Sequence, residues 1–192
     1  MSDYRRYFVP GGTYFFTLVS YRRRPQFARP ADVQRLREAV AAVQREQPFR
    51  ILAAVVLPDH LHFVWTLPAG DADYSRRIGR MKVHFTRSCR TPSSSTVERS
   101  LSRRKHRESV VWQRRFWEHT IDEEGELAAF LDYIHYNPVK HRLASCPHAC
   151  PASSFSRWVA LGLYEKSWGC CCQAGRASVR DFGDILDRVG EP

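Results

Sequence analysis

Two β-rich runs stand almost back to back near the middle of the chain, and they restrict the possible folds more than any other feature. Residues 50–57 and 61–67 are rich in aliphatic and aromatic side chains, and the turn-forming pair Pro58-Asp59 separates them. Two such runs joined by so short a turn predict an antiparallel hairpin. The rest of the fold must therefore extend an antiparallel sheet around this hairpin.

The patterns on either side of the hairpin supply the remaining elements. An aromatic and β-branched run at 13–20 predicts a first strand, and a shorter run at 116–121 predicts a last one. Helices are expected over 30–46, over about 74–89 and over 123–136. The order β, α, β, β, α, β, α is that of an α+β, ferredoxin-like βαββαβ unit with an added C-terminal helix. We expect an antiparallel sheet with helices on one face.

Length and composition are those of one globular domain with a hydrophobic core. The 192 residues are 43% hydrophobic and 26% charged. The chain has no apolar run long enough to cross a membrane, and its first residues lack the apolar stretch of a secretory signal. We therefore expect a cytoplasmic protein.

Positive charge is concentrated in one segment. Of the 30 Lys and Arg residues, 13 lie within residues 75–115, where Glu98 and Glu108 are the only acids, and the rest of the chain is close to neutral. Such a concentration is typical of a surface that binds a polyanion, nucleic acid above all. A basic surface that only keeps the protein soluble is the alternative. Residues of about 91–110 are rich in Ser, Thr and Arg, and we expect them to form a flexible basic loop.

The six cysteines do not have the spacing of a metal or disulfide framework. Cys146 and Cys150 have no second pair to match them, and the three adjacent cysteines, Cys170 to Cys172, cannot easily all turn toward one ion. Disulfides are also rare in the cytoplasm. We therefore expect no disulfide framework, and structural zinc is the less favoured interpretation.

A pair of histidines lies in the second strand of the hairpin. Alternate residues of a strand point to the same side, so His60 and His62 share one face while Leu61, Phe63 and Trp65 share the other. We expect the apolar face to pack and the histidines to point outward from an uncovered face. Two neutral imidazoles side by side can hold a divalent metal ion. Ordinary exposed or core histidines are the alternative.

The helix expected over 123–136 leads to a second group of polar side chains. Tyr133 and Asn137 are four residues apart, so on a helix they point in nearly the same direction. This spacing can place a phenol beside an amide oxygen that serves as a third metal ligand. Because Pro138 disfavours helical dihedral angles at Asn137, we expect the helix to fray there. A tyrosine that seals the edge of the core is the alternative for Tyr133.

Three motifs in this order resemble those of one family. They are Val55-Val-Leu-Pro-Asp-His-Leu-His62, Trp112-Gln-Arg-Arg-Phe-Trp-Glu-His119 and Asp132-Tyr-Ile-His-Tyr-Asn-Pro-Val-Lys-His141. The sequence resembles the REP-associated tyrosine transposases, which belong to the single-tyrosine HUH transposases, over most of residues 4–168. The resemblance implies a metal pair matched by His60 and His62, a nucleophile matched by Tyr133 and an amide ligand matched by Asn137.

The resemblance also implies an organisation for the chain. We expect an HUH transposase catalytic domain over residues 1–168, and a C-terminal tail over 169–192 to which no role is assigned. The sequence departs from the family pattern at Arg142, where a glycine is usual, and at Cys150, where a tryptophan is usual. Neither position coincides with an expected metal ligand.

The function implied by the resemblance is metal-dependent cleavage and rejoining of single-stranded DNA through a 5′-phosphotyrosine, with Mg²⁺ or Mn²⁺ as the cofactor. The implied targets are hairpins of repetitive extragenic palindromes, and single strands are what a tyrosine on a protein can reach. His119 and His135 are candidates for the base that takes the tyrosine proton. The expected DNA contacts are Tyr4, Arg5, Arg6, Lys82, Arg114, Arg115 and Lys140.

Two other functions compete with this one. A nucleic-acid-binding module with a ferredoxin-like sheet would bind without a metal or a covalent adduct. A metal-dependent hydrolase would cut with water and leave no protein attached to the DNA. No membrane and no protein partner are implied.

Overall fold

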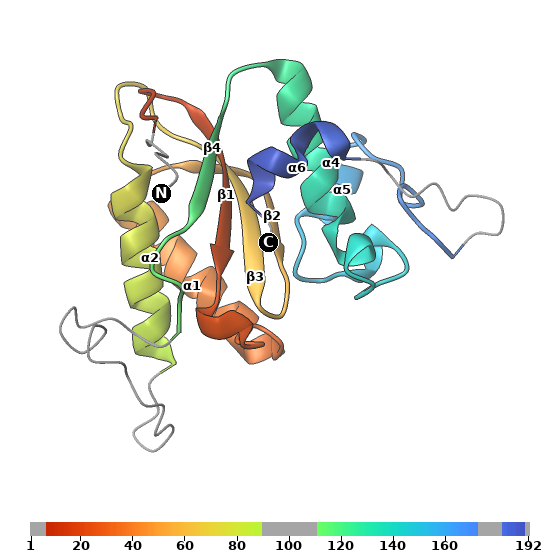
Figure 1. Cartoon of the computed structure of the whole chain (residues 1–192), viewed down its shortest axis with the longest axis horizontal. Helices are drawn as coiled ribbons and strands as arrows, with labels where there is room; N and C mark the ends of the chain where they lie inside the picture. Colours follow the sequence, from red (N-terminus) through yellow and green to blue (C-terminus); the bar gives the residue numbers. More distant parts are fainter. Residues whose placement is uncertain (1–6, 90–110, 173–181, 191–192) are drawn as a thin grey trace.

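The structure is a computed structural model that describes residues 7–89, 111–172 and 182–190 (Figure 1). The basic loop expected at about 91–110 and the candidate DNA contacts Tyr4, Arg5 and Arg6 lie outside the described residues. Among the residues that are described, no helix has the length and apolar character needed to span a membrane.

Four antiparallel strands form one sheet in the spatial order β2-β3-β1-β4. They are β1 (Thr13–Val19), β2 (Arg50–Val56), β3 (His60–Thr66) and β4 (Trp117–Ile121). β1 lies in the centre and pairs with β3 on one side and with β4 on the other. The predicted hairpin of β2 and β3 is confirmed, and with it the ferredoxin-like α+β plan.

Two helices cover the first face of the sheet, as predicted from the alternation in β3. They are α1 (Pro30–Glu46) and α2 (Tyr74–Ser88), and a short 3-10 turn, η1 (Tyr21–Arg23), precedes them. The core on this face combines aromatic side chains of the strands, such as Phe16 and Trp65, with the apolar sides of both helices. A proline at the first helical position of α1 supports the start of that helix.

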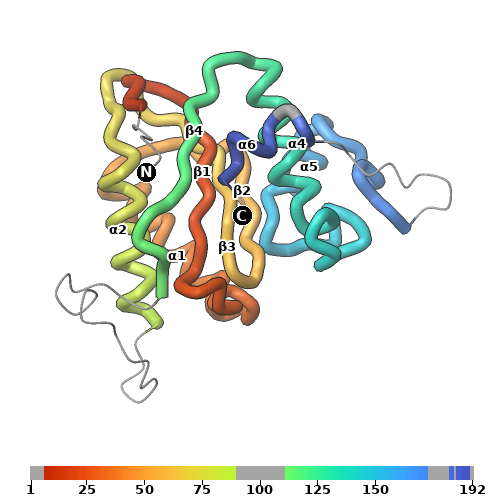
Figure 2. Tube along the Cα trace, in the orientation of Figure 1, coloured from red at the N-terminus to blue at the C-terminus, as the bar shows by residue number. Residues whose placement is uncertain are grey.

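The second face of the sheet is also covered, contrary to the expectation of helices on one face only. α4 (Glu124–Lys140) and α6 (Gly183–Val189) lie on it, on the opposite side from α1 and α2 (Figure 2). The physical reason is that β1 and β2 are apolar on both faces, and Phe15 stacks on Phe130 of α4 with ring centroids 4.6 Å apart. The histidines of β3 are therefore buried and do not point into solvent.

α4 continues beyond its predicted end. Pro138 lies inside the helix and Asn137 is fully buried, so the expected fraying at Asn137 is wrong. The main-chain carbonyl of Asn137 accepts a hydrogen bond from His141, and that of Pro138 accepts one from Leu143. Most of the helix from 130 to 139 is buried, and this packing outweighs the local preference of a residue before proline.

The chain after α4 folds back toward the end of that helix. It forms a 3-10 turn, η2 (Pro147–Ala149), and a short helix, α5 (Phe155–Ala160), and it then brings Cys170 beside Cys146. A disulfide joins these two cysteines, a single pairing that the spacing of the cysteines does not predict. The reversal of the chain at α5 places residues that are 24 positions apart side by side, and spacing along the sequence does not reveal this.

Candidate active site

The register of the sheet determines where the two histidines of β3 lie. His60 lies opposite Val19 and His62 opposite Thr17 of β1. Their ring centroids are 5.1 Å apart and the rings are nearly perpendicular. Both side chains are buried where α4 packs on β3, with relative exposures of 2% for His60 and 0% for His62. The strand thus places two imidazoles side by side, as the sequence predicts, but in an enclosed position.

Hydrogen bonds fix which nitrogen of each ring carries the proton. Nδ1 of His60 lies 2.7 Å from Oδ1 of Asp59, and a carboxylate can only accept, so Nδ1 donates. Nδ1 of His62 lies 2.9 Å from the hydroxyl of Thr17, which donates its own hydrogen to the carbonyl of Val189. Nδ1 of His62 therefore also donates. In the neutral form of each ring the proton is thus on Nδ1, which leaves Nε2 as the nitrogen that can ligate a metal.

Asp59 is in turn held by an arginine. Nη1 of Arg23 lies 2.7 Å from the second carboxylate oxygen of Asp59. Burial alone would raise the pKa of Asp59, but its hydrogen bonds and charge interactions with His60 and Arg23 hold the pKa below its ordinary value. The carboxylate is therefore ionised at neutral pH and orients His60. Such an outer partner is typical of metal-binding histidines, so this donor set fits a divalent ion.

α4 brings the predicted tyrosine to the histidines. The Tyr133 ring lies 5.5 Å from the His62 ring, centroid to centroid, and makes an edge contact with Phe15. Asn137 follows one helical turn later and is also fully buried. The structure thus gathers His60, His62 and Tyr133 at one place between β3 and α4, with Asn137 on the same helix.

Lys140 lies against the tyrosine hydroxyl. Its ammonium donates a hydrogen bond to the Tyr133 oxygen at 3.0 Å, and it also lies 4.7 Å from the centre of the ring. From the sequence we expected Lys140 to contact DNA. If the predicted helix is continued through Pro138, Lys140 follows Tyr133 by seven residues, about two helical turns. The spacing then places Lys140 on the same side of the helix as Tyr133.

His141 also lies at the candidate site, although no site role is predicted for it from the sequence. Its ring lies 5.1 Å from the ring of His60, centroid to centroid. His141 caps the end of α4, where its main-chain N–H bonds to Asn137. The Lys140-His141 pair therefore brings two further nitrogen groups to the candidate site.

The two histidines considered as bases have other partners. His135 lies 3.0 Å from the Ser154 hydroxyl, and burial, with the nearby charge of Arg157, lowers its pKa to about 3. It is neutral at physiological pH and packs among the aromatic residues around α5. His119 is 2.8 Å from the Glu126 carboxylate. These contacts give both histidines structural roles.

Residues 182–190 lie over the site, although the sequence predicts no role for the tail over 169–192. The Phe182 ring makes an edge contact with the Tyr133 ring, with centroids 5.4 Å apart. The carbonyl of Val189 accepts a hydrogen bond from the Thr17 hydroxyl. The indole N–H of Trp117 donates a hydrogen bond to the carbonyl of Arg188 at 2.8 Å. α6 thus runs across β1 and β4 (Figure 2). Together with Phe182, it belongs to the core that buries Tyr133.

The remaining candidate DNA contacts that the structure describes lie at or near the segment leading into β4. Arg114 and Arg115 are exposed there. Lys82 of α2 donates to the carbonyl of Gln113 at 3.0 Å and lies over the rings of Trp112 and Phe116. Lys82 therefore helps to pack this segment against α2.

Comparison with known proteins identifies the family of this chain. The family model described as "Transposase IS200 like" matches residues 9–137. A REP-associated tyrosine transposase of Escherichia coli K12 is 42% identical over 88% of this chain and 91% of its own length. A Haemophilus influenzae protein with the same family name is 40% identical over 96% of this chain and all of its own length.

A solved structure agrees with these relatives. It is described as a REP-associated tyrosine transposase bound to a REP hairpin, and it is 40% identical in sequence to this chain. The superposition has a TM-score of 0.75 and covers 94% of this chain and 99% of that one.

Proposed function

The chain belongs to the IS200-like transposase family, and from this premise we propose that it cleaves and rejoins single-stranded DNA at hairpins of repetitive extragenic palindromes. The transposases of this family break and rejoin DNA strands. The hairpin substrate follows from the solved relative, which is bound to a REP hairpin. The observation that carries the mechanism is that the Tyr133 phenol contacts both the His62 ring and the Lys140 ammonium.

We infer that His60, His62 and Asn137 hold the divalent metal that HUH transposases generally use, as Mg²⁺ or Mn²⁺. The Nε2 atoms of the two histidines and the amide oxygen of Asn137 are the donors. When bound, such an ion neutralises charge on the scissile phosphate and orients it. Asp59 and Thr17 hold the imidazoles in the ligating form before any ion arrives.

Tyr133 is the proposed nucleophile. Its oxygen attacks a DNA phosphorus, a new O–P bond forms, and the bond from phosphorus to the 3′ oxygen breaks. The phenolic proton is lost and the departing 3′ oxygen gains one, so the products are a 5′-phosphotyrosine and a free 3′-OH. Attack by another 3′-OH reverses the step, and joining therefore needs no ATP.

Lys140 supports this attack. A phenol loses its proton with a pKa of about 10, so negative charge on its oxygen must be stabilised near neutral pH. The Lys140 ammonium at 3.0 Å is placed to do so through a charge-assisted hydrogen bond.

A substrate on the chromosome also implies a cytoplasmic location for the protein.

Detection of a covalent bond between protein and DNA is the decisive measurement. Labelled single-stranded hairpin oligonucleotides from the host's own repeats are incubated with the protein and Mg²⁺ or Mn²⁺ and run on denaturing gels. We expect a protein band that carries labelled DNA and requires metal. The band should be absent with Tyr133→Phe and present with Tyr136→Phe, which removes the hydroxyl of the next tyrosine on α4.

Each other outcome selects a different function. Cut strands without an adduct would identify a hydrolase that uses water. DNA that is bound but never cut, across several hairpin sequences, would identify a binding module. An adduct that persists with Tyr133→Phe would assign the nucleophile to another residue.

A further inference from the structure

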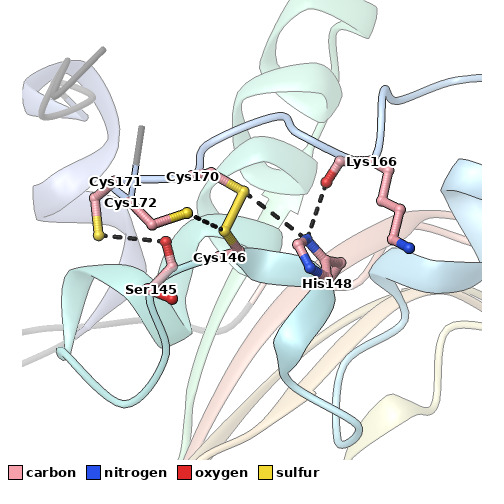
Figure 3. Close-up of a disulfide and its surroundings, with 7 residues drawn as sticks. All are labelled: Ser145, Cys146, His148, Lys166, Cys170, Cys171 and Cys172. Atoms are coloured by element: carbon pink, nitrogen blue, oxygen red, sulfur yellow. Dashed lines mark hydrogen bonds between the residues drawn. A yellow bond between two sulfur atoms is a disulfide. The ribbon is translucent and has the colours of Figure 1, made fainter. Parts of the chain in front are cut away.

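Figure 3 shows a cluster of sulfur and imidazole groups. Its residues follow α4 in the chain, and none of them belongs to the candidate active site. Potential metal-ligand atoms of Cys146, His148 and Cys170 all lie within 4.8 Å of one another. The sulfur of Cys172 is 3.2 Å from that of Cys146. Nδ1 of His148 is 3.8 Å from the sulfur of Cys170, so four soft or borderline donors meet at one place.

The donors come as two pairs with the same spacing, one on each of two segments. Cys146 and His148 are two residues apart at η2, and Cys170 and Cys172 are two residues apart on the returning chain. Cys171, between them, turns away, because its sulfur lies 3.2 Å from the carbonyl of Ser145 (Figure 3). The objection that three adjacent cysteines cannot share an ion therefore does not apply, since only the outer two are needed.

We propose that in the reduced protein Cys146, His148, Cys170 and Cys172 bind one Zn²⁺ ion. Tetrahedral zinc with bonds of about 2.3 Å to sulfur requires neighbouring ligand atoms about 3.8 Å apart. The separations of 3.2 Å and 3.8 Å are already close to that value. Cys146 and Cys170 are bonded to each other in this structure, so these two sulfurs must be reduced and move apart before they bind the ion.

Zinc binding requires changes in where the protons of the four ligands lie. The three thiols lose their protons when they bind. Nδ1 of His148 lies 3.1 Å from the carbonyl of Lys166, to which it donates, so it must give up this hydrogen bond and the ring proton must reside on Nε2. Reduction by a phosphine is balanced, because the phosphine takes an oxygen atom from water and the disulfide becomes two thiols.

Four protein ligands make a closed site, and closed zinc sites are structural. The cluster would join the turn after α4 to the chain around Trp168 and Gly169. Trp168 packs on Phe155, and Gly169 lies close to Tyr136 of α4 and to Pro147. Zinc would thus fix the end of the helix that carries Tyr133.

The test is a cobalt and zinc titration of the full chain after reduction with a phosphine. Co²⁺ bound to thiolates has a near-ultraviolet charge-transfer band, whereas the histidines and amide of the active site cannot produce one. We expect this band to saturate at one equivalent and to disappear when Zn²⁺ is added. Cys172→Ser should weaken binding more than about 100-fold, since removing even an outer-shell partner costs 10- to 100-fold.

Cys171→Ser is the matched control, because it removes a neighbouring thiol that points away, and it should bind like the parent. Cys172→His keeps a ligand at the position and should still bind cobalt, which separates lost coordination from lost folding. Absence of the charge-transfer band in fully reduced parent protein would overturn the proposal. Equal loss of binding in Cys171→Ser and Cys172→Ser, or loss in Cys172→His with the fold intact by circular dichroism, would also overturn it.

Discussion

Lys140 has two possible roles that a single substitution can separate. If it stabilises the charge that develops on the Tyr133 oxygen, Lys140→Met should lower the rate of adduct formation at saturating DNA by about 100-fold, the usual cost of losing one such donor. Lys140→Arg, which keeps the charge, should retain part of the rate. Single-turnover kinetics with a labelled hairpin measure both. Weaker DNA binding with an unchanged rate at saturation would instead support the DNA contact predicted from the sequence.

His135 makes the stability of the fold depend on pH. Its pKa is about 3 in the folded chain because the ring is buried, against about 6.5 when unfolded. Between these values the unfolded chain holds more protons, so stability is greatest above pH 6.5 and falls as the pH drops toward 3. From pH 7.5 to 5 this one group should cost about 2 kcal/mol.

Urea unfolding at the two pH values, with the parent and with His135→Gln, tests this. The variant cannot titrate, so its loss of stability on acidification should be smaller by about that amount. The comparison uses the change with pH within each protein, so any constant cost of the substitution cancels. Equal losses in the two proteins would assign the acid sensitivity to other groups.

At the scale of elements, local pattern predicted most of the sheet and its first helices. The bounds of α1 agree with the prediction residue for residue, because its apolar spacing and its proline lie within one continuous segment. The pair of β2 and β3 was predictable for the same reason. The side-by-side placement of His60 and His62 followed from the alternation of a strand.

What could not be predicted depends on contacts between distant segments. α6 encloses the site through the hydrogen bond from Thr17 to the Val189 carbonyl and through the ring contact of Phe182 with Tyr133. No short sequence pattern near residue 182 indicates either contact. The sequence alone does not connect Lys140 with Tyr133, because Pro138 predicts that the helix ends before Lys140. Burial of α4 decided against that local preference, and burial depends on the whole fold.

α6 depends on a glycine at its end. Gly190 has a φ of +58°, and a Cβ there would lie inside contact distance of the Trp117 ring. Gly190→Ala should therefore lower the free energy of unfolding by at least about 1 to 2 kcal/mol, the cost of the left-handed conformation alone. Urea unfolding followed by tryptophan fluorescence measures this.

Gly79→Ala is the matched control for that substitution. Gly79 lies inside α2, and a Cβ there meets nothing within 4 Å. Alanine favours a helix, so this variant should gain about 0.5 to 1 kcal/mol. The two substitutions should thus change stability in opposite directions. A Gly190→Ala protein as stable as Gly79→Ala would mean that residue 190 does not take this left-handed conformation against Trp117.

At the scale of the whole molecule, the proposed chemistry and the exposed charge lie in different places. The tyrosine and histidines are enclosed between β3 and α4, whereas Arg114 and Arg115 are exposed on the segment that leads into β4. A strand held by the exposed arginines would be bound through its phosphates, independently of cleavage. Binding and chemistry should therefore respond to different substitutions.

Salt dependence tests the role of this exposed segment. Each phosphate contact to single-stranded DNA contributes about 0.7 to the slope of log affinity against log salt concentration. The double variant Arg114→Gln/Arg115→Gln should lower that slope by about 1.4, measured by fluorescence anisotropy with a hairpin oligonucleotide in the Tyr133→Phe background. Arg45→Gln/Arg50→Gln removes the same charge from exposed positions on α1 and β2 and should leave the slope unchanged. Equal effects of the two double variants would mean that net charge, rather than this surface, holds the DNA.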